Sequence, residues 1–271
     1  MSSPARTTQP GPGADPAEWE QTGVRLEVAD AVATVTLCRP ERRNAQSPAL
    51  WRALAAIGRA LPGSVRLVVL RAEGISFSAG LDRAMFTPEG IPGESSLLDL
   101  ATGDGDAAIA GFQQAFTWWR RPDIVSVAAV QGHAVGAGFQ LALACDLRVV
   151  ADDVQFAMRE TVLGLVPDLA GTKPLVDLVG PARALEICGT GRWVQAEEAV
   201  RIGLANVAVP AAELDAAVAD LSAALLAAPR DALVETKALL QGAGGRSHEE
   251  QQAAERAAQV RRLRDLAGVG E

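Results

Sequence analysis

Tyrosine is absent from this chain of 271 residues, histidine occurs twice and cysteine three times, and aromatic residues make up only 4% of it. With only two histidines, His133 and His248, a histidine-based zinc site is effectively excluded. The three cysteines are far apart and lack metal-ligand spacing, which indicates structural thiols in a reducing compartment. A core with so few aromatic side chains must consist mainly of alanine, valine and leucine, and the hydrophobic fraction of 49% is sufficient for one.

Basic residues and long apolar runs are also scarce. The 25 Lys and Arg against 33 Asp and Glu give a net charge of −8. We expect no nucleic-acid partner, because phosphate backbones bind a broad basic surface. No apolar run approaches the ~18 residues that span a membrane, and residues 1–18 lack the apolar segment of a secretory signal. We therefore expect a cytoplasmic protein without membrane contact.

The distribution of residue types predicts three parts. Residues 1–18 are rich in Pro, Gly, Ser and Thr, and we expect them to form a disordered tail. Residues 19–202 alternate short apolar runs with turn and helix signals, and we expect them to form the core. Residues 203–271 are expected to form a C-terminal helical region. Its predicted helices cover 213–227, 230–241 and 247–267.

Local patterns place the first elements of the core. Apolar residues alternate with period two on both sides of residues 29–31, which predicts a hairpin. Ser47 followed by Pro48 is typical of an N-cap and a first helical residue, and the helix is predicted to run to Leu61.

Strand–turn–helix units follow near Leu67, Val125 and Leu147, and they imply right-handed crossovers and mixed sheets. The segment 85–106 is long and rich in Gly, Pro, Glu and Ser, so we expect a mobile loop there.

Two glycine-containing turns each follow an apolar run that is typical of a buried strand. Residues 77–82 follow the run 67–70, and residues 132–139 follow the run 124–130. Small residues permit a sharp bend that exposes backbone N–H groups. The second turn continues into a helical pattern, and the N-terminus of a helix favours negative charge. Two such amides pointing at one carbonyl oxygen would form an oxyanion hole, which indicates chemistry on a carbonyl compound.

Other interpretations of these turns are weaker. Either turn alone could be a tight connection between a strand and a helix. A nucleotide-phosphate site at Gly132, Gly136 and Gly138 is disfavoured, because the run lacks the dinucleotide-binding spacing and an acidic ribose partner.

At these two turns the chain resembles the crotonase (enoyl-CoA hydratase/isomerase) superfamily, and the resemblance runs from Val24 to the C-terminal helices. It implies an α/β fold, namely a crotonase-like spiral of ββα units with a C-terminal helical trimerisation region. It also implies self-association as a homotrimer or a dimer of trimers. The other segments that carry the resemblance are residues 39–45, 144–148, 156–160, 164–167 and 190–210.

The resemblance also implies site residues. Leu81 and Ala137 occupy the positions whose amides form the family's oxyanion hole, and Glu160 occupies the position of its second catalytic carboxylate. Partly apolar surroundings would raise the pKa of Glu160 toward acid–base use. The alternative is a surface glutamate paired with Arg159.

Gln140 departs from the pattern, because many hydratases of the family carry their first glutamate there. An amide can orient a water molecule but cannot accept a proton at neutral pH. Asp168 lies eight residues after Glu160, where enoyl- and dienoyl-CoA isomerases of the family also carry an acid. The two carboxyls could then divide the acid and base roles. The alternative for Asp168 is a cap on a helix beginning near Thr172.

The expected substrate is an acyl-CoA thioester. Arg42, Arg43, Ala79 and Arg83 lie near the loops that hold CoA in relatives, and arginine suits phosphate recognition. No metal or separate cofactor is implied, because CoA arrives as part of the substrate. We expect an enzyme that isomerises or hydrates the double bond of an enoyl-CoA through an enolate, and Gln140 favours isomerisation.

Two other functions remain open. A non-catalytic acyl-CoA-binding member of the family is suggested by Gln140. Some serine peptidases share the spiral fold that the resemblance implies. This function is disfavoured here, because the chain has no Gly-x-Ser-x-Gly elbow. His133 is expected to pack or hydrogen bond behind the second turn rather than to catalyse.

Overall fold

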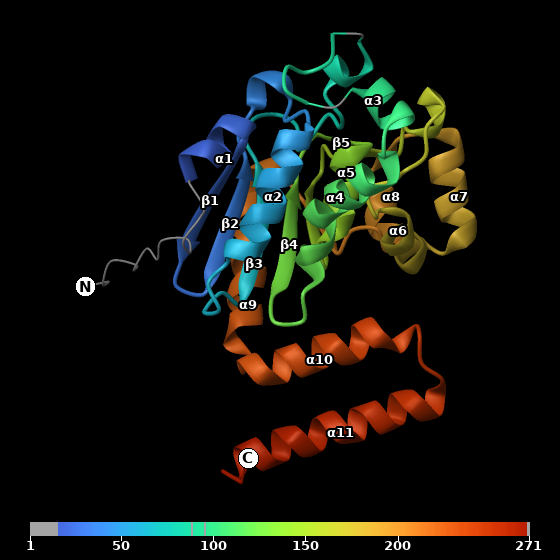
Figure 1. Cartoon of the computed structure of the whole chain (residues 1–271). Coiled ribbons are helices and arrows are strands. Elements are labelled where there is room, and N and C mark those ends of the chain that lie inside the picture. Colours follow the sequence, from blue (N-terminus) through green and yellow to red (C-terminus); the bar gives the residue numbers. More distant parts are fainter. Residues whose placement is uncertain (1–15, 88, 95, 270–271) are drawn as a thin grey trace.

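The computed structural model describes residues 16–87, 89–94 and 96–269. A six-stranded sheet has the order β1-β2-β3-β4-β6-β9, and a three-stranded sheet has the order β5-β7-β8 (Figure 1). The strands are β1 (Val24–Ala29), β2 (Val32–Leu37), β3 (Leu67–Ala72), β4 (Val125–Val130), β5 (His133–Val135), β6 (Leu147–Ala151), β7 (Gln155–Ala157), β8 (Val194–Gln195) and β9 (Val207–Val209). The α-helices are α1 (Pro16–Thr22), α2 (Pro48–Ala60), α3 (Leu97–Thr102), α4 (Gly105–Thr117), α5 (Ala137–Ala144), α6 (Thr172–Val179), α7 (Pro181–Thr190), α8 (Ala196–Arg201), α9 (Leu214–Ala227), α10 (Arg230–Ala243) and α11 (His248–Leu266).

The chain winds as a spiral that visits both sheets in each turn. Strands β3, β4 and β6 lie parallel in the larger sheet, and after each of them the chain crosses to the smaller sheet. The crossing after β3 is marked by a bridge between Ser78 and Ala134. The β1–β2 and β7–β8 pairs are antiparallel, so both sheets are mixed. The α/β spiral of ββα units expected from the sequence is therefore present.

Two helical layers cover the larger sheet, because its side chains alternate between the two faces. Val68 and Leu70 of β3 point into the main core, which includes residues of α2, α4 and α5. Leu67 and Val69 point to the opposite face, where they form a second cluster with α9. Figure 1 shows α2 and α4 on the first side of the sheet.

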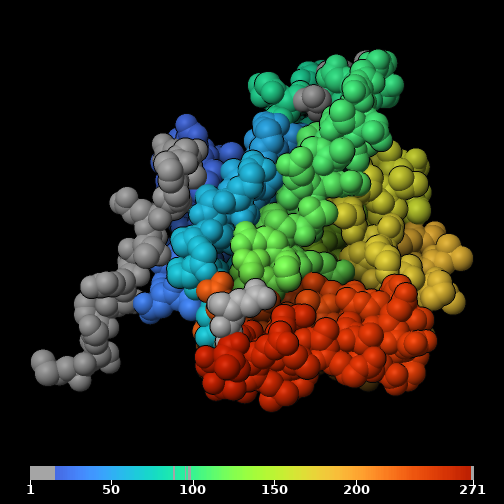
Figure 2. All heavy atoms as spheres, turned by 60° about the horizontal axis from the view of Figure 1, so that its bottom comes forward, coloured from blue at the N-terminus to red at the C-terminus, as the bar shows by residue number. Residues whose placement is uncertain are grey.

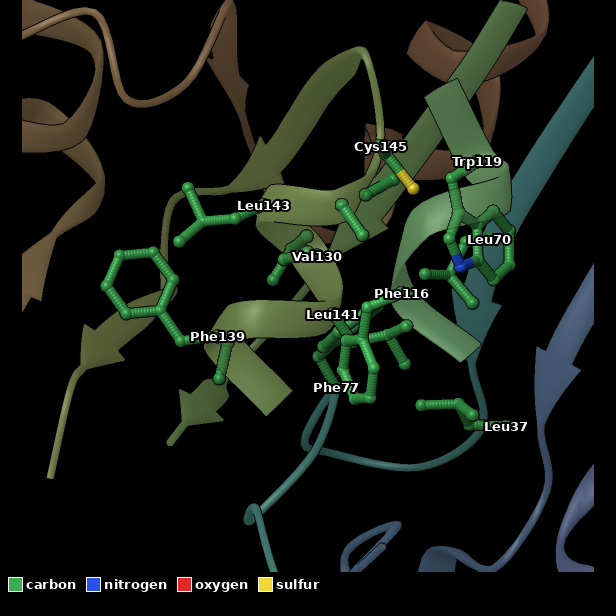
Figure 3. Close-up of a cluster of buried hydrophobic side chains, with 14 of the residues drawn as sticks. Leu37, Leu70, Phe77, Phe116, Trp119, Val130, Phe139, Leu141, Leu143 and Cys145 are labelled. Atoms are coloured by element: carbon green, nitrogen blue, oxygen red, sulfur yellow. The ribbon is translucent and has the colours of Figure 1, made fainter. Parts of the chain in front are cut away.

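The main core joins the first glycine turn to the helices around it. Phe77, at the start of that turn, lies close to Phe116 of α4 and Leu141 of α5 (Figure 3). All three side chains are at most 2% exposed. This packing fixes the turn against α5, the helix that follows the second turn.

The hairpin and the first long helix agree with the sequence. The β1–β2 hairpin pairs Val24 with Leu37. In α2, the Ser47 hydroxyl accepts from the amide of Leu50 at 3.4 Å, and Pro48 is the first helical residue.

The N-terminal segment differs from expectation at residues 16–18. They were predicted to end a disordered tail, but they form the first turn of α1. Trp19 is only 5% exposed and belongs to the main core, which holds this helix in place. The rest of the predicted tail, residues 1–15, lies outside the described residues.

The segment 85–106 contains more regular structure than a loop. It includes α3 and the start of α4. Ser96 and Asp99 form a reciprocal capping box, in which the Asp99 amide donates to the Ser96 hydroxyl at 3.1 Å and the Ser96 amide donates to the Asp99 carboxylate at 2.8 Å. The expectation of one continuous mobile loop was wrong, because these caps begin a helix.

The C-terminal helices agree with those predicted, although the larger sheet continues past residue 202, because β9 pairs with β6. Lys237 of α10 is buried and donates to the Asp146 carboxylate at 2.7 Å, which anchors α10 to the core. Helices α10 and α11 form one end of the molecule, opposite α3 (Figures 1 and 2). Among the described residues, no helix is long and apolar enough to cross a membrane.

Candidate active site

The two glycine turns lie side by side. The Ser78 amide donates to the His133 carbonyl at 2.9 Å, and the Val135 amide donates to the Ser78 carbonyl at 3.0 Å. Gly80 has a φ of 88°, and a Cβ there would lie 2.5 Å from the Val135 carbonyl oxygen. Glycine is therefore needed for this approach of backbone to backbone. The structure thus brings together the turns that the sequence singled out.

Each turn leaves one backbone amide free at the cavity described below. The Gln46 amide donates to the Gly80 carbonyl, and the Asp82 amide donates to the Gln46 carbonyl. The backbone groups on both sides of the Leu81 amide are therefore hydrogen bonded. Ala137 is the first residue of α5, where an N–H has no partner within the helix. Within the described part of the chain, neither the Leu81 nor the Ala137 amide donates to another protein group. Both residues line the cavity.

The pairing of β5 with β7 places Glu160 beside the second turn. The Gly136 amide donates to the Ala157 carbonyl at 2.9 Å, and a Cβ on Gly136 would lie 3.2 Å from Glu160 Oε1. Arg159 does not pair with Glu160, because it donates to the Gly191 carbonyl at 2.8 Å and stacks over Trp193. The interpretation of Glu160 as a surface residue paired with Arg159 was therefore wrong.

The two oxygens of the Glu160 carboxyl have different surroundings. Oε1 accepts from Gln140 Nε2 at 2.7 Å. Oε2 is buried and has no hydrogen-bond partner among the described residues. Burial raises the pKa of Glu160, and the nearby charge of Asp168 raises this pKa further. The hydrogen bond from Gln140 lowers it, but burial has the larger effect. The two oxygens are therefore not equivalent, because only Oε1 has a hydrogen-bond partner among the described residues.

Gln140 is 1% exposed, and its amide has only one orientation that satisfies its neighbours. Its Oε1 accepts from the amides of Leu169 at 2.9 Å and Gly171 at 3.3 Å, so its NH₂ group must face Glu160. Ala170, between these two donors, has a left-handed φ of 61°. Because a carbonyl oxygen has two lone pairs, Gln140 Oε1 has no acceptor capacity left for a water molecule.

Asp168 lines the same cavity as Glu160, and burial raises its pKa. Helix α6 begins at Thr172 after Gly171 and has no side-chain cap, so Asp168 does not cap it. Within the described residues, neither Glu160 nor Asp168 has a Lys or Arg at ion-pair distance. The structure therefore places two unpaired carboxyls around one cavity.

The cavity has a volume of about 740 Å³ and is mainly apolar away from the two carboxyls. Trp51 of α2 and Phe112 of α4, whose ring centroids are 4.9 Å apart, form part of its aromatic lining. Other apolar side chains of the wall are those of Met85, Phe86, Leu100, Ile109, Leu163, Leu165, Val166 and Leu169.

The residues expected to contact CoA separate into two pairs. Ala79 and Arg83 line the cavity. Arg42 binds the buried Asp82 carboxylate at 3.1 Å and does not line the cavity. The Arg43 side chain is exposed, while its carbonyl accepts from the Ala79 amide at 2.8 Å. All four positions are thus linked to the rim formed by the first turn.

His133 lies outside the cavity, as expected. Its Nδ1 is 3.3 Å from the Ser76 hydroxyl, and its ring meets the edge of Trp193. In the described part of the chain, no group of three or more His, Cys, Asp or Glu side chains is arranged to hold a metal ion.

Gln113 of α4 was not predicted from the sequence. Its Nε2 donates to the carbonyl oxygen of Asp168 at 2.7 Å. A polar residue next to Phe112 on an amphipathic helix is the only signal in the sequence, and it does not identify a partner 55 residues away.

Comparison with known proteins agrees with this architecture. The family model described as enoyl-CoA hydratase/isomerase matches residues 27–265. A crystal structure of a "putative enoyl-CoA hydratase" from Thermobifida fusca YX in complex with CoA is 49% identical, with a TM-score of 0.90, and the match covers 94% of this chain and 98% of that chain. A second structure so described, in complex with acetoacetyl-CoA, is also 49% identical with a TM-score of 0.90, covering 93% and 98%. A "Probable enoyl-CoA hydratase" from Rhodobacter capsulatus is 35% identical over 187 residues, 69% of this chain and 68% of that protein.

The ββα spiral and its likeness to these structures define a protein of the crotonase fold, which confirms the fold class expected from the sequence. The chain belongs to the enoyl-CoA hydratase/isomerase family.

Proposed function

We propose that the protein is an enzyme whose substrate is an enoyl-CoA thioester and that it moves or hydrates the double bond of the acyl chain. The amides of Leu81 and Ala137 bind the thioester carbonyl oxygen, and Glu160 transfers a proton at the α-carbon. The CoA complexes of the Thermobifida fusca relative support the substrate class. CoA arrives as part of the substrate, and its contacts are expected at Arg42, Arg43, Ala79 and Arg83. No further cofactor takes part in the proposed reaction.

The observation that carries this proposal is that Glu160, whose buried Oε2 has no partner, lines the same cavity as Leu81 and Ala137, whose amides donate to no other group among the described residues. Removal of a proton from the α-carbon moves negative charge onto the thioester oxygen. Each amide that donates to this oxygen is worth roughly 3–4 kcal/mol in enzymes with such donors. The raised pKa of Glu160 favours return of the proton at neutral pH.

Isomerisation is favoured over hydration by the state of Gln140. Hydration needs a group that accepts a proton from water, but Gln140 cannot be a base and both acceptor positions of its oxygen are filled. Isomerisation of a 3-enoyl-CoA needs no water: one carboxyl removes a proton from C2, the double bond moves, and a proton is returned to C4. Asp168 supplies the second carboxyl for this exchange.

A screen of 2-enoyl-, 3-enoyl- and dienoyl-CoA esters in deuterated water tests the proposal. Mass spectrometry distinguishes the addition of water from double-bond movement with deuterium uptake. We expect turnover of the 3-enoyl ester with little hydration of the 2-enoyl ester. Tight binding of every ester without deuterium uptake would instead identify a non-catalytic acyl-CoA-binding member of the family, the second candidate suggested by Gln140.

A further inference from the structure

Helix α4 links the apolar wall of the cavity to the backbone of Asp168. Ile109 and Phe112 of this helix form part of the wall, and Gln113 follows Phe112 directly. The half-buried Gln113 side chain donates through Nε2 to the Asp168 carbonyl oxygen at 2.7 Å. The surface that would contact the acyl group and the support of one carboxyl therefore belong to the same helix.

A second contact holds the following residues from the other side. Gln140 of α5 accepts from the amides of Leu169 and Gly171, and the same side chain donates to Glu160. Ala170 keeps a left-handed φ of 61° between these amides, a conformation that a residue other than glycine adopts at a cost of roughly 1–2 kcal/mol. Surrounding contacts must hold such a strained turn in place.

We infer that Gln113 is a positioning residue, which holds the Asp168 carboxyl in the cavity through the main chain and couples it to the acyl-binding face of α4. This inference rests on the proposed function for the role of Asp168, but the contact itself is measurable without turnover. With Gln113 in place, residues 168–171 are held from α4 and from α5. Without its donor, the Asp168 carbonyl turns to water, and the carboxyl moves with it out of the cavity.

The matched variants are Gln113→Met and Gln114→Met. Methionine keeps the length of the side chain and removes the donor. Gln114 is the exposed neighbour on the same helix, and its contact is with Arg59 on the surface. Thermal unfolding verifies that both variants are folded. Gln113→Asn and Gln113→Lys add a rescue test, because only the longer lysine side chain brings a donor to the carbonyl.

The first readout is the pKa of Asp168, measured by NMR titration of enzyme labelled with ¹³C-aspartate. The Asp168 signal is assigned by its loss in Asp168→Asn. The other ionisable groups lining the cavity are Glu160, Arg83 and Arg159. Because burial raises the pKa of Asp168, we expect Gln113→Met to lower it toward the ordinary value. Gln114→Met should leave it unchanged. An unaltered titration in Gln113→Met overturns the inference, whatever reaction the enzyme catalyses.

The second readout is turnover of a 3-enoyl-CoA. We expect Gln113→Met to lower kcat about tenfold to 100-fold with KM within about threefold, as for a misplaced catalytic group. Gln113→Lys should recover part of the loss, and Gln113→Met should add little to Asp168→Asn. If Asp168→Asn retains full activity, the role proposed for Asp168 fails and the titration alone decides the positioning contact. If Asp168→Asn is impaired while Gln113→Met is not, the inference fails and the proposed function stands.

Discussion

The carboxyl of Glu160 is held through one oxygen and free at the other, so one substitution tests its role. Glu160→Gln keeps the shape and the acceptor for Gln140 but cannot exchange a proton. We expect kcat to fall at least ~100-fold, with the affinity for a CoA ester changed only a few-fold. Steady-state kinetics and calorimetric titration with a non-reactive acyl-CoA measure the two quantities. A variant with nearly unchanged kcat would contradict the assignment.

Gln140 offers the converse test. In Gln140→Glu, one carboxylate oxygen can still accept from the amides of Leu169 and Gly171. The other would replace the NH₂ group that lies 2.7 Å from Glu160 Oε1. The new group can accept a proton from water, so we expect hydration of 2-enoyl-CoA to increase.

The two carboxyls of this variant would share a proton, because like charges at this distance raise each other's pKa. The gain in hydration should therefore depend on pH, and rates measured across pH for both reactions test this. Gln140→Leu is the control, since it removes the donor without adding a base. A gain in hydration in Gln140→Leu as well would show that the base is not position 140.

Some properties of these residues could be predicted from the sequence, and others could not. The two turns were singled out from local motifs, and Glu160 and Asp168 from the resemblance to the family; the structure places all of them around one cavity. The orientation of the Gln140 amide could not be predicted, because it depends on two amides about 30 residues away, presented by a strained turn at Ala170. Such a contact leaves no periodic signal in the chain.

At the scale of elements, the N-terminus of α5 allows a test of the free amide. Proline fits well at the first position of a helix, because its fixed φ suits that position and its N–H is not needed for the helix. Ala137→Pro should therefore keep the fold and abolish turnover by removing one donor to the thioester oxygen. Ala137→Gly keeps the N–H and should be mild. Circular dichroism monitors folding, and equal loss of kcat in both variants would mean that the methyl group of Ala137 matters rather than its amide.

At the scale of elements, the composition of segment 85–106 predicted a loop, whereas the structure contains a helix there. Its Gly, Pro and Ser content is typical of a loop, yet Ser96 and Asp99 stand at the spacing of a capping box. That signal was available in the sequence and marks the start of α3. The pairing of the two sheets through Ser78 and Ala134, in contrast, joins residues far apart in the chain and cannot be derived from local patterns.

At the scale of the whole molecule, we predict a homotrimer or a dimer of trimers. The C-terminal helices leave apolar side chains in solvent, with Leu240 71% exposed, Leu263 53% and Leu266 85%. These side chains lie on α10 and α11, which form one end of the molecule, and this end is the surface that we expect to bind another copy of the chain. Sedimentation velocity at micromolar concentration measures the assembly. A monomer under these conditions would contradict the prediction.

Removal of the chain after Pro210 is predicted to cause aggregation for a different reason. Helix α9 buries Leu214 and Val218 against the outer face of the larger sheet, beside Val69 and Val127. Without α9 this apolar face would be open to water. Light scattering of the purified truncated chain measures the effect, and a soluble, monodisperse product would contradict it.

The unpartnered carboxyl oxygen of Glu160 also has a thermodynamic consequence, because a buried carboxylate without a partner for this oxygen is expected to destabilise the folded protein. The pKa of Glu160 is raised on folding, so the folded state binds its proton more tightly than the unfolded state. Its contribution to the free energy of unfolding is therefore fully present below the unfolded pKa and is lost as the pH rises through the folded pKa.

At neutral pH, Glu160→Gln should accordingly be more stable than the natural protein, by about 1 kcal/mol or roughly 2–4 °C in Tm at equal protein concentration. The difference should shrink as the pH falls and vanish below the ordinary glutamate value of 4.5, where the carboxyl is protonated in both states. Calorimetric unfolding at several pH values measures it, and a less stable variant at neutral pH would contradict the prediction. We therefore predict that the proton-transfer role proposed for Glu160 is retained at a cost to the stability of the folded protein.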